Sequence, residues 1–232
     1  MHSPGKIAFS IFGLDVAWYG ILIGFGFLLA TLISYKRAPK HGINPDFILD
    51  LILWMIPAAI IGARAYYVIF QWDYYAGDWA KIFDVRGGGL AIHGGLILCF
   101  LVGYFVCRRH KESFLATADL AAVVIPLAQA IGRWGNFFNE EAHGMQTDLP
   151  WAQIIDGVGY HPTFLYESIW CFALFWFLLW FDNRHRSFNG QIICLYMILY
   201  SVERFFVEGL RTDSLMFGPL RQAQLISLGL IL

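Results

Sequence analysis

Six long apolar stretches determine what this chain can fold into. They lie near residues 16–35, 47–70, 89–107, 114–135, 163–181 and 190–210. A helix needs about 20 predominantly apolar residues to cross a bilayer, whereas a strand of a transmembrane barrel needs only about 9–11. Inside a bilayer the backbone must satisfy its own hydrogen bonds. The sequence therefore predicts an all-α fold, a polytopic transmembrane helical bundle.

A seventh apolar stretch starts at about residue 221 and stops at Leu232, which is too short for a full span. We therefore expect seven helices, the last of them truncated, in one transmembrane domain comprising residues 1–232. The segment 136–162 is polar, aromatic and rich in helix breakers, so it is predicted to form a small extracytoplasmic head insert. Its breakers are Gly144, Pro150, Gly157, Gly159 and Pro162.

Composition excludes several functional classes. Residues are 58% hydrophobic and only 14% charged, which rules out an ordinary soluble surface. The net charge of -1 argues against nucleic acid as a partner. The four cysteines have no CxxC spacing, so neither a disulfide framework nor a zinc site is predicted. Metal-protease, acyl-serine and nucleotide motifs are missing, so we expect no metal and no cofactor.

Short basic clusters predict the orientation. They follow the first, third and fifth apolar stretches and contain Lys36, Arg37, Lys40, Arg108, Arg109, Lys111, Arg184 and Arg186. By the positive-inside rule these loops are cytoplasmic. The N-terminus, the 71–88 loop, the head insert and the 211–220 loop then face outward. Trp72, Tyr74, Tyr75 and Trp79 fit an outer interfacial belt.

Two helices each carry a polar stripe that cannot face lipid. The fourth places Asp119, Pro126, Gln129, Arg133 and Asn136 on one face, and the sixth places Tyr200, Arg204, Glu208 and Arg211 on one face. Arginine has a planar fork that suits phosphate, so two such stripes favour an anion site. Internal pairing is the alternative, with Glu208 or Glu203 for Arg204 and with Glu140 or Glu141 for Arg133.

Other polar residues at the outer ends of helices leave two interpretations open. His93 lies among five glycines and is either a hydrogen-bonded structural residue or a proton acceptor. Tyr19 is either an interfacial anchor or part of the site. Glu167 is a candidate to orient an arginine or to cap a helix. Arg64, which also faces inward, is interpreted as structural.

Taken together, these residues resemble the bacterial prolipoprotein diacylglyceryl transferases. The order and spacing match from about residue 16 to the C-terminus. The matching segments are Trp18-Tyr19-Gly20, His93-Gly94-Gly95, residues 132–139 with Glu141 and Gly144, His161-Pro162-Thr163 with Tyr166-Glu167, and residues 204–208 with Arg211.

The resemblance implies a multi-pass enzyme of the bacterial cytoplasmic (inner) membrane, with its N-terminus and active site facing outward. Such an enzyme works among membrane lipids. It transfers the diacylglyceryl group of phosphatidylglycerol to the thiol of the lipobox cysteine in a preprolipoprotein signal peptide, and it releases glycerol 1-phosphate. A transporter or binding protein for an anionic lipid or metabolite is the alternative function.

The resemblance also implies roles for single residues. Arg133 would bind the lipid phosphate, and Arg204 would be the second essential arginine. His93 and Tyr19 are the candidates for the base that takes the thiol proton. The expected binding set for phosphatidylglycerol is Arg133, Asn136, Glu141, Gly144, Arg204, Glu208 and Arg211. Glu141 is favoured over Glu140 as the partner of Arg133.

Overall fold

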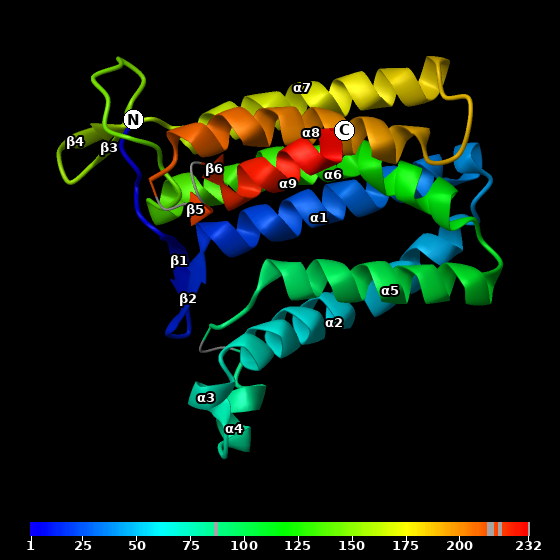
Figure 1. The fold of residues 1–232 in the computed structure, drawn as a ribbon, viewed down its shortest axis with the longest axis horizontal. Helices are drawn as coiled ribbons and strands as arrows, with labels where there is room; N and C mark the ends of the chain where they lie inside the picture. Colours follow the sequence, from blue (N-terminus) through cyan, green and yellow to red (C-terminus); the bar gives the residue numbers. More distant parts are fainter. Residues whose placement is uncertain (86–87, 213–215, 218–219, 232) are drawn as a thin grey trace. The chain divides into compact units, whose positions relative to one another are not determined.

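Each long apolar stretch forms a helix in the computed structural model, which describes residues 1–85, 88–212, 216–217 and 220–231. The predicted helical stretches are confirmed, with ends shifted by a few residues (Figure 1). They are α1 (Trp18–Arg37), α2 (Pro45–Phe70), α5 (Ile92–His110), α6 (Phe114–Asn139), α7 (Thr163–Arg184) and α8 (Gln191–Leu210), and the last stretch forms α9 (Gln222–Ile231). Of the 211–220 loop, residues 213–215 and 218–219 lie outside the described residues.

Five helices in the described part of the chain are long and apolar enough to cross a membrane. They are α1 together with the 3-10 helix η1 (Ala38–His41), α2, α5, α6 and α7. The 20-residue α8 has the length but carries Glu203, Arg204 and Glu208, and it is not among the five. The protein is therefore a helical multi-pass membrane protein.

The chain divides into two compact units. The first comprises Met1–Ser34 and Ala118–Leu232, and the second comprises Tyr35–Thr117. The core of the first unit brings together fully or almost fully buried apolar residues of α6, α7 and α8. These are Ala122, Val123, Val124, Leu174, Leu178 and Ile192. α7 packs against α8, and α8 packs against α9.

A buried carboxylate of α6 fixes the start of α8. Asp119, which is fully buried, accepts hydrogen bonds from the backbone N–H groups of Gly190 (2.8 Å) and Ile193 (3.0 Å). Arg186 lies 3.7 Å from the same carboxylate. A side-chain oxygen that accepts the free N–H groups of a first turn caps a helix, and negative charge there is favourable. Asp119 is thus a structural residue that joins α6 to α8.

Glycines allow the helices of the second unit to pack closely. A Cβ at Gly94 of α5 would lie 2.2 Å from the carbonyl oxygen of Gly62 in α2, and one at Gly95 would lie 3.0 Å from that of Ala59. Small residues at a helix interface let two backbones approach each other in this way. Gly94 and Gly95, which follow His93, therefore serve the contact between α2 and α5.

Arg64 is structural, as its position in the sequence indicated. Its guanidinium donates to the carbonyl oxygens of Lys81 (2.5 Å), Ile82 (2.9 Å), Gly88 (2.7 Å) and Gly89 (2.9 Å). It also lies 5.0 Å from the ring centre of Tyr75. Tyr75 is buried beneath it, in contrast to the exposed aromatic residues Trp72, Tyr74 and Trp79 of the same segment.

Two short helices occupy the segment that Arg64 holds, α3 (Trp72–Tyr75) and α4 (Trp79–Phe83). Asp78 caps α4 by accepting a hydrogen bond from the backbone N–H of Lys81 at 3.2 Å. This hydrogen bond lowers the pKa of the Asp78 carboxyl below its ordinary value. The segment therefore has defined structure of its own.

Short β-hairpins are the feature that the sequence did not predict, so the fold is mostly helical and not purely all-α. β1 (Ile7–Ile11) pairs with β2 (Leu14–Ala17) ahead of α1, and β3 (Gln153–Ile155) pairs with β4 (Val158–Tyr160) in the predicted head insert. β5 (Met216–Phe217) pairs with β6 (Leu220–Arg221). Because α6 continues to Asn139, the non-helical part of the segment 136–162 begins at residue 140.

Candidate functional site

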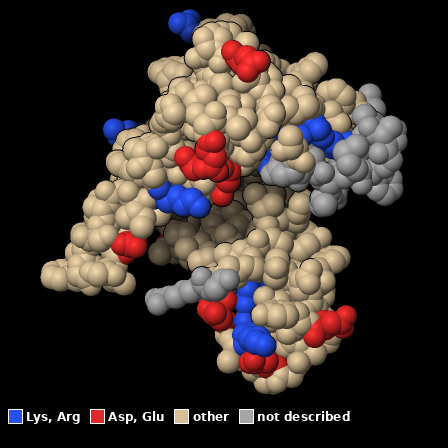
Figure 2. All heavy atoms as spheres, turned by 90° about the vertical axis from the view of Figure 1, so that its left-hand side faces the viewer, with Lys and Arg blue, Asp and Glu red and all other residues tan. Residues whose placement is uncertain are grey.

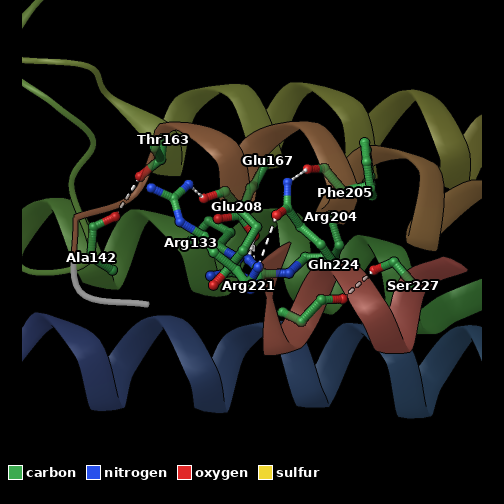
Figure 3. Close-up of polar contacts among 11 residues, drawn as sticks. Arg133, Ala142, Thr163, Glu167, Arg204, Phe205, Glu208, Arg221, Gln224 and Ser227 are labelled. Carbon is green, nitrogen blue, oxygen red and sulfur yellow. Dashed lines mark hydrogen bonds and ion pairs between the residues drawn. The ribbon is translucent and has the colours of Figure 1, made fainter. Parts of the chain in front are cut away.

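Two arginines from different helices share one buried carboxylate (Figure 3). Glu167 of α7 places its Oε2 2.5 Å from Nη2 of Arg133 in α6 and 3.1 Å from Nη1 of Arg204 in α8. The Glu167 side chain is 1% exposed. Two guanidiniums on one carboxylate must lie close together, so the predicted pair of arginines is brought into a single site.

A second carboxylate holds Arg204 from the same helix. Nη2 of Arg204 donates to Oε2 of Glu208 at 2.5 Å, one helical turn away. The arginine side chains keep 20% and 17% of their surface exposed, whereas those of Glu167 and Glu208 keep 1% and 7%. The carboxylates therefore hold the guanidiniums from the buried side, and donor groups remain accessible from the other side.

The structure decides between the pairing alternatives. Glu208 is confirmed as a partner of Arg204. Both carboxylate oxygens of the neighbouring Glu203 are buried without a hydrogen-bond partner among the described residues. The expectation that Glu140 or Glu141 holds Arg133 is wrong, because the ion pair of Arg133 is formed with Glu167. In the folded chain Glu167 of α7 reaches Arg133 of α6, although the two residues are distant in sequence.

β6, directly ahead of α9, contributes a further arginine that the sequence did not suggest. Nη1 of Arg221 donates to the backbone carbonyl of Glu208, and Nε2 of Gln224 donates to that of Phe205 at 3.1 Å (Figure 3). These carbonyls lie near the C-terminal end of α8, where positive charge is favourable. In the sequence, the one sign of this contact was that a cation, Arg221, stands at the start of the last apolar stretch.

A row of polar groups continues from the arginines between α6, α7 and α8. Gln129 accepts hydrogen bonds from the hydroxyl of Tyr196 at 3.2 Å and from the thiol of Cys171 at 3.9 Å. The rings of Tyr196 and Tyr200 are stacked, with centroids 5.5 Å apart. The predicted polar faces of α6 and α8 therefore do meet inside the first unit.

Several residues of the expected binding set surround the C-terminal end of α6. The side-chain amides of Asn136 and Asn139 donate to Oε1 of Glu141 at 3.0 and 3.2 Å. Glu141 thus orders the asparagines. The backbone of Gly144 forms an isolated antiparallel β-bridge with that of Arg211. The N–H of Gly144 donates to the carbonyl of His161 at 2.9 Å.

Gly144 also occupies a position that only glycine fits. A Cβ added there would lie 2.7 Å from Cβ of His161 and 3.1 Å from the carbonyl of Leu210. Nearby, the hydroxyl of Thr163 donates to the carbonyl of Ala142 (Figure 3). The head segment is thereby tied to the start of α7 and the end of α8.

Tyr19 lies directly against the helix that carries Arg133. A Cβ at Gly135 would approach its ring to 2.3 Å, so the tyrosine ring packs on the glycine surface. The preceding Trp18 stacks on Phe138 with ring centroids 5.0 Å apart. The start of α1 is therefore fitted to the last turns of α6, two residues from the arginine.

An apolar cavity of about 650 Å³ opens beside the arginine pair, between α1, α6 and α7. Its polar groups are satisfied, because the hydroxyl of Ser168 donates to the carbonyl of Ala130 (2.8 Å) and accepts from Nε1 of Trp134 (3.1 Å). Trp134 and Ser168 directly follow Arg133 and Glu167 in sequence. The lining residues are Leu22, Phe25, Leu127, Ala130, Ile131, Trp134, Leu165, Ser168, Ile169, Phe172 and Ala173.

An arginine pair beside an apolar cavity suits an anion with a hydrocarbon tail, and the comparison with known proteins agrees with this chemistry. The family model described as prolipoprotein diacylglyceryl transferase matches residues 6–232. The chain belongs to this family.

Individual relatives of the prolipoprotein diacylglyceryl transferase family match almost the whole chain. Proteins named phosphatidylglycerol–prolipoprotein diacylglyceryl transferase are 52% identical over 227 residues in Finegoldia magna and 55% identical over 223 residues in Clostridioides difficile. These alignments cover 98% and 96% of the chain and 92% and 90% of the relatives. A relative of the same name in Gloeobacter violaceus is 47% identical over 243 residues, with 99% and 90% covered.

The remaining predicted catalytic residue of this diacylglyceryl transferase family member lies in the second unit. His93 is exposed in the first turn of α5, and its ring centroid lies 6.3 Å from that of Tyr66 in α2. Arg133, Arg204 and Tyr19 belong to the first unit.

The helix ends of this diacylglyceryl transferase family member carry small groups of charge. On the face drawn in Figure 2, which is the left-hand side of Figure 1, basic and acidic side chains lie near one another in a few groups, and uncharged side chains make up most of the rest. Among the described residues no group of three or more histidine, cysteine, aspartate or glutamate side chains is placed to hold a metal ion.

Proposed function

We propose that this protein transfers the diacylglyceryl group of phosphatidylglycerol to the lipobox cysteine thiol in the signal peptide of a preprolipoprotein. The observation that carries the proposal is the pair Arg133 and Arg204 on the shared carboxylate of Glu167, beside an apolar cavity. Family membership and the names of the relatives support the same reaction.

The proposed step is a displacement at carbon. The cysteine sulfur attacks the glycerol carbon that carries the phosphate, a C–S bond forms, and the C–O bond breaks. The electron pair of the broken bond goes to the phosphate oxygen, which leaves as glycerol 1-phosphate. A base takes the thiol proton, because the thiolate is the nucleophile. The leaving group gains negative charge, so its stabilisation lowers the barrier.

In this proposal the arginines bind the phosphate and stabilise the charge that develops on it. A guanidinium carries five N–H donors. In the described part of the chain, the ion pair of Arg133 engages Nη2, which leaves donors of the same group for an anion. The carboxylates reduce the cost of placing two cations together in a nonpolar setting. Preorganised donors of this kind need no rearrangement during the reaction.

Other predicted residues have supporting roles in the proposal. Tyr19 positions the last turns of α6 through Gly135, and Glu208 orients Arg204. Asn136, Glu141, Gly144 and Arg211 form the outer rim through which the head group would enter. The cavity between α1, α6 and α7 offers apolar surface for the hydrocarbon part of the lipid.

His93 is our proposed proton acceptor, directly or through water, because the family resemblance marks this position as important for activity. A neutral imidazole can accept the thiol proton near neutral pH. Tyr19 is the second candidate for the base.

We further propose that the bundle contains seven helices in the bacterial cytoplasmic (inner) membrane, with the N-terminus, the head insert 136–162 and the site facing outward. The distribution of lysine and arginine supports this orientation. A cysteine introduced at Asp148 should react with an impermeant reagent from the outer side. Labelling from the cytoplasmic side alone would contradict it.

The direct test combines purified protein, phosphatidylglycerol and a lipobox peptide, with mass spectrometry of the peptide. We expect a diacylglyceryl thioether adduct and free glycerol 1-phosphate. Diacylglycerol, which lacks the phosphate leaving group, should give no adduct. Tight binding of the anionic lipid without any adduct would instead support the alternative, a transporter or binding protein.

A matched pair of variants tests the arginine site. Arg204→Ala should lower the rate of transfer roughly 10²–10³-fold, as expected for the loss of a preorganised charge-stabilising donor. Arg184→Ala removes an exposed arginine at the C-terminal end of α7, whereas Glu167 lies near its start, and it should have little effect on transfer. Normal transfer by Arg204→Ala would remove Arg204 from the mechanism.

A further inference from the structure

The hairpin β1–β2 has an unusual tip. Its strands are joined by Phe12 and Gly13, both with positive φ (51° and 79°), between the paired residues Ile11 and Leu14. A two-residue hairpin turn with two positive φ values is common, but asparagine or aspartate followed by glycine is the usual choice. A bulky residue with positive φ is an outlier. Phe12 is also completely exposed (101%).

A second hairpin of the same unit shows the usual choice. In β3–β4 the turn residues Asp156 and Gly157 have φ values of 50° and 80°, almost identical to those of Phe12 and Gly13. The flanking pair is Ile155 and Val158. The backbone of the two turns is therefore equivalent, and the phenylalanine at the first tip is not needed to form it.

The rest of the first hairpin is also apolar and exposed. Its large residues keep 49–74% of their surface accessible, namely Ile7, Phe9, Ile11 and Leu14. Its polar side chains satisfy each other, since Ser10 donates to Asp15 across the strands at 2.5 Å. An apolar element with internally paired polar groups fits a surrounding that is itself apolar.

The position of the hairpin identifies that surrounding. β2 ends at Ala17 and α1, a membrane span, begins at Trp18, whose N–H donates to the carbonyl of Lys6 at 3.0 Å. In Figure 1 the hairpin leaves the start of α1 on the side away from α7 and α8. Strands of four or five residues extend only about 17 Å at about 3.3 Å per residue, so the tip stays close to the bilayer boundary.

We propose that the hairpin β1–β2 is a membrane-interface anchor, in which Phe12 inserts its ring among the lipid chains next to the start of α1. Apolar groups of interfacial elements enter about 5–10 Å into the boundary between head groups and acyl chains. The partner is the lipid surface itself. Such an anchor requires only that α1 is inserted in the membrane, so its test is independent of the proposed transfer reaction.

Equivalent positions of the two hairpins provide the test. Leu14 and Val158 each follow their turn directly, so a fluorophore on Leu14→Cys is compared with the same fluorophore on Val158→Cys. Both variants are made in a background in which the exposed Cys194 is replaced by serine. In phosphatidylglycerol-containing vesicles, we expect quenching by lipids with a shallow spin label to be at least roughly twofold stronger at position 14. Equal quenching, or none at position 14, would overturn the proposal.

A second variant removes the phenylalanine ring without changing the turn. Phe12→Asn keeps the turn, because asparagine tolerates positive φ. With Phe12→Asn present, quenching of the fluorophore at position 14 should fall roughly twofold while the unfolding midpoint in detergent stays equal or rises. The matched control is Asp156→Asn with the fluorophore at position 158, where no change is expected. Unchanged quenching with Phe12→Asn would show that the phenylalanine does not hold the hairpin in the lipid.

Discussion

Glu167 lies 2.5 Å from Arg133 although 34 residues separate them in the chain. The same carboxylate oxygen contacts Arg204, so one anion of α7 links cations of α6 and α8. Removing the central carboxylate would leave two guanidiniums in mutual repulsion. The arrangement therefore makes Glu167 the residue on which the geometry of the arginine pair depends.

Glu167→Gln should impair both stability and transfer. Breaking a buried ion pair by removing one partner costs about 3–5 kcal/mol in the free energy of unfolding. We expect a lower unfolding midpoint in detergent and a transfer rate reduced roughly 100-fold, because the arginines lose their preorganisation. Glu140→Gln is the control, since Glu140 is exposed and was one of the two partners considered from sequence. A normal rate for Glu167→Gln would contradict the role assigned to the shared carboxylate.

The contacts of Arg133 and Arg204 illustrate what a sequence can and cannot predict. Arg204 and Glu208 lie four residues apart on one helix, and the helical period alone places them side by side. The partner of Arg133 comes from another helix, and its identity depends on how α6 and α7 pack. The family resemblance favoured Glu141, which instead binds the amides of Asn136 and Asn139. Glu167 was a candidate to orient an arginine, but the sequence did not specify which one.

The helices could be predicted from the sequence, whereas the hairpins could not. Runs of about 20 apolar residues specify a span by length alone. β1–β2 was missed because its tip is Phe12-Gly13, which lacks the usual turn residues, and its strands have no consistent polar face. Arg64 was correctly interpreted as structural, but the four carbonyl groups that it binds belong to a segment whose path the sequence does not determine.

His93→Gln tests the proposed base through the pH dependence of the rate. Protonated imidazole cannot accept the thiol proton, so a parent enzyme that uses His93 loses activity as the pH falls. Glutamine cannot titrate, and the acid limb due to His93 should disappear together with a roughly 10²–10⁴-fold loss of rate, the range for general base catalysis. Transfer of the diacylglyceryl group is measured between about pH 5 and 8. If the variant keeps the rate and profile of the parent, Tyr19 becomes the leading candidate.

Gly135→Ala tests the fit between α1 and α6. The added methyl group would meet the Tyr19 ring at 2.3 Å, and overpacking of this kind costs about 1–3 kcal/mol. We expect a lower unfolding midpoint and weaker transfer, because the displaced helix end lies two residues from Arg133. Gly20→Ala is the control, since a Cβ there meets nothing within 4 Å.

The double variant Gly135→Ala with Tyr19→Ala distinguishes packing from chemistry. Removal of the ring relieves the clash, so the unfolding midpoint should recover. Transfer should stay low, because Tyr19 is part of the proposed site. Recovery of both stability and transfer would show that Tyr19 serves packing alone.

Asp119→Asn separates structural polar residues of α6 from functional ones. Asp119 accepts N–H groups of Gly190 and Ile193 with its two oxygens, and asparagine would turn an N–H donor toward one of these donors. Leaving a buried donor unsatisfied costs about 1–3 kcal/mol. We therefore expect a lower unfolding midpoint with unchanged transfer per folded molecule. Asp148→Asn, in the exposed part of the head segment, should change neither quantity. Loss of transfer by Asp119→Asn at full stability would place Asp119 in the functional site, because a cap for α8 affects activity only through folding.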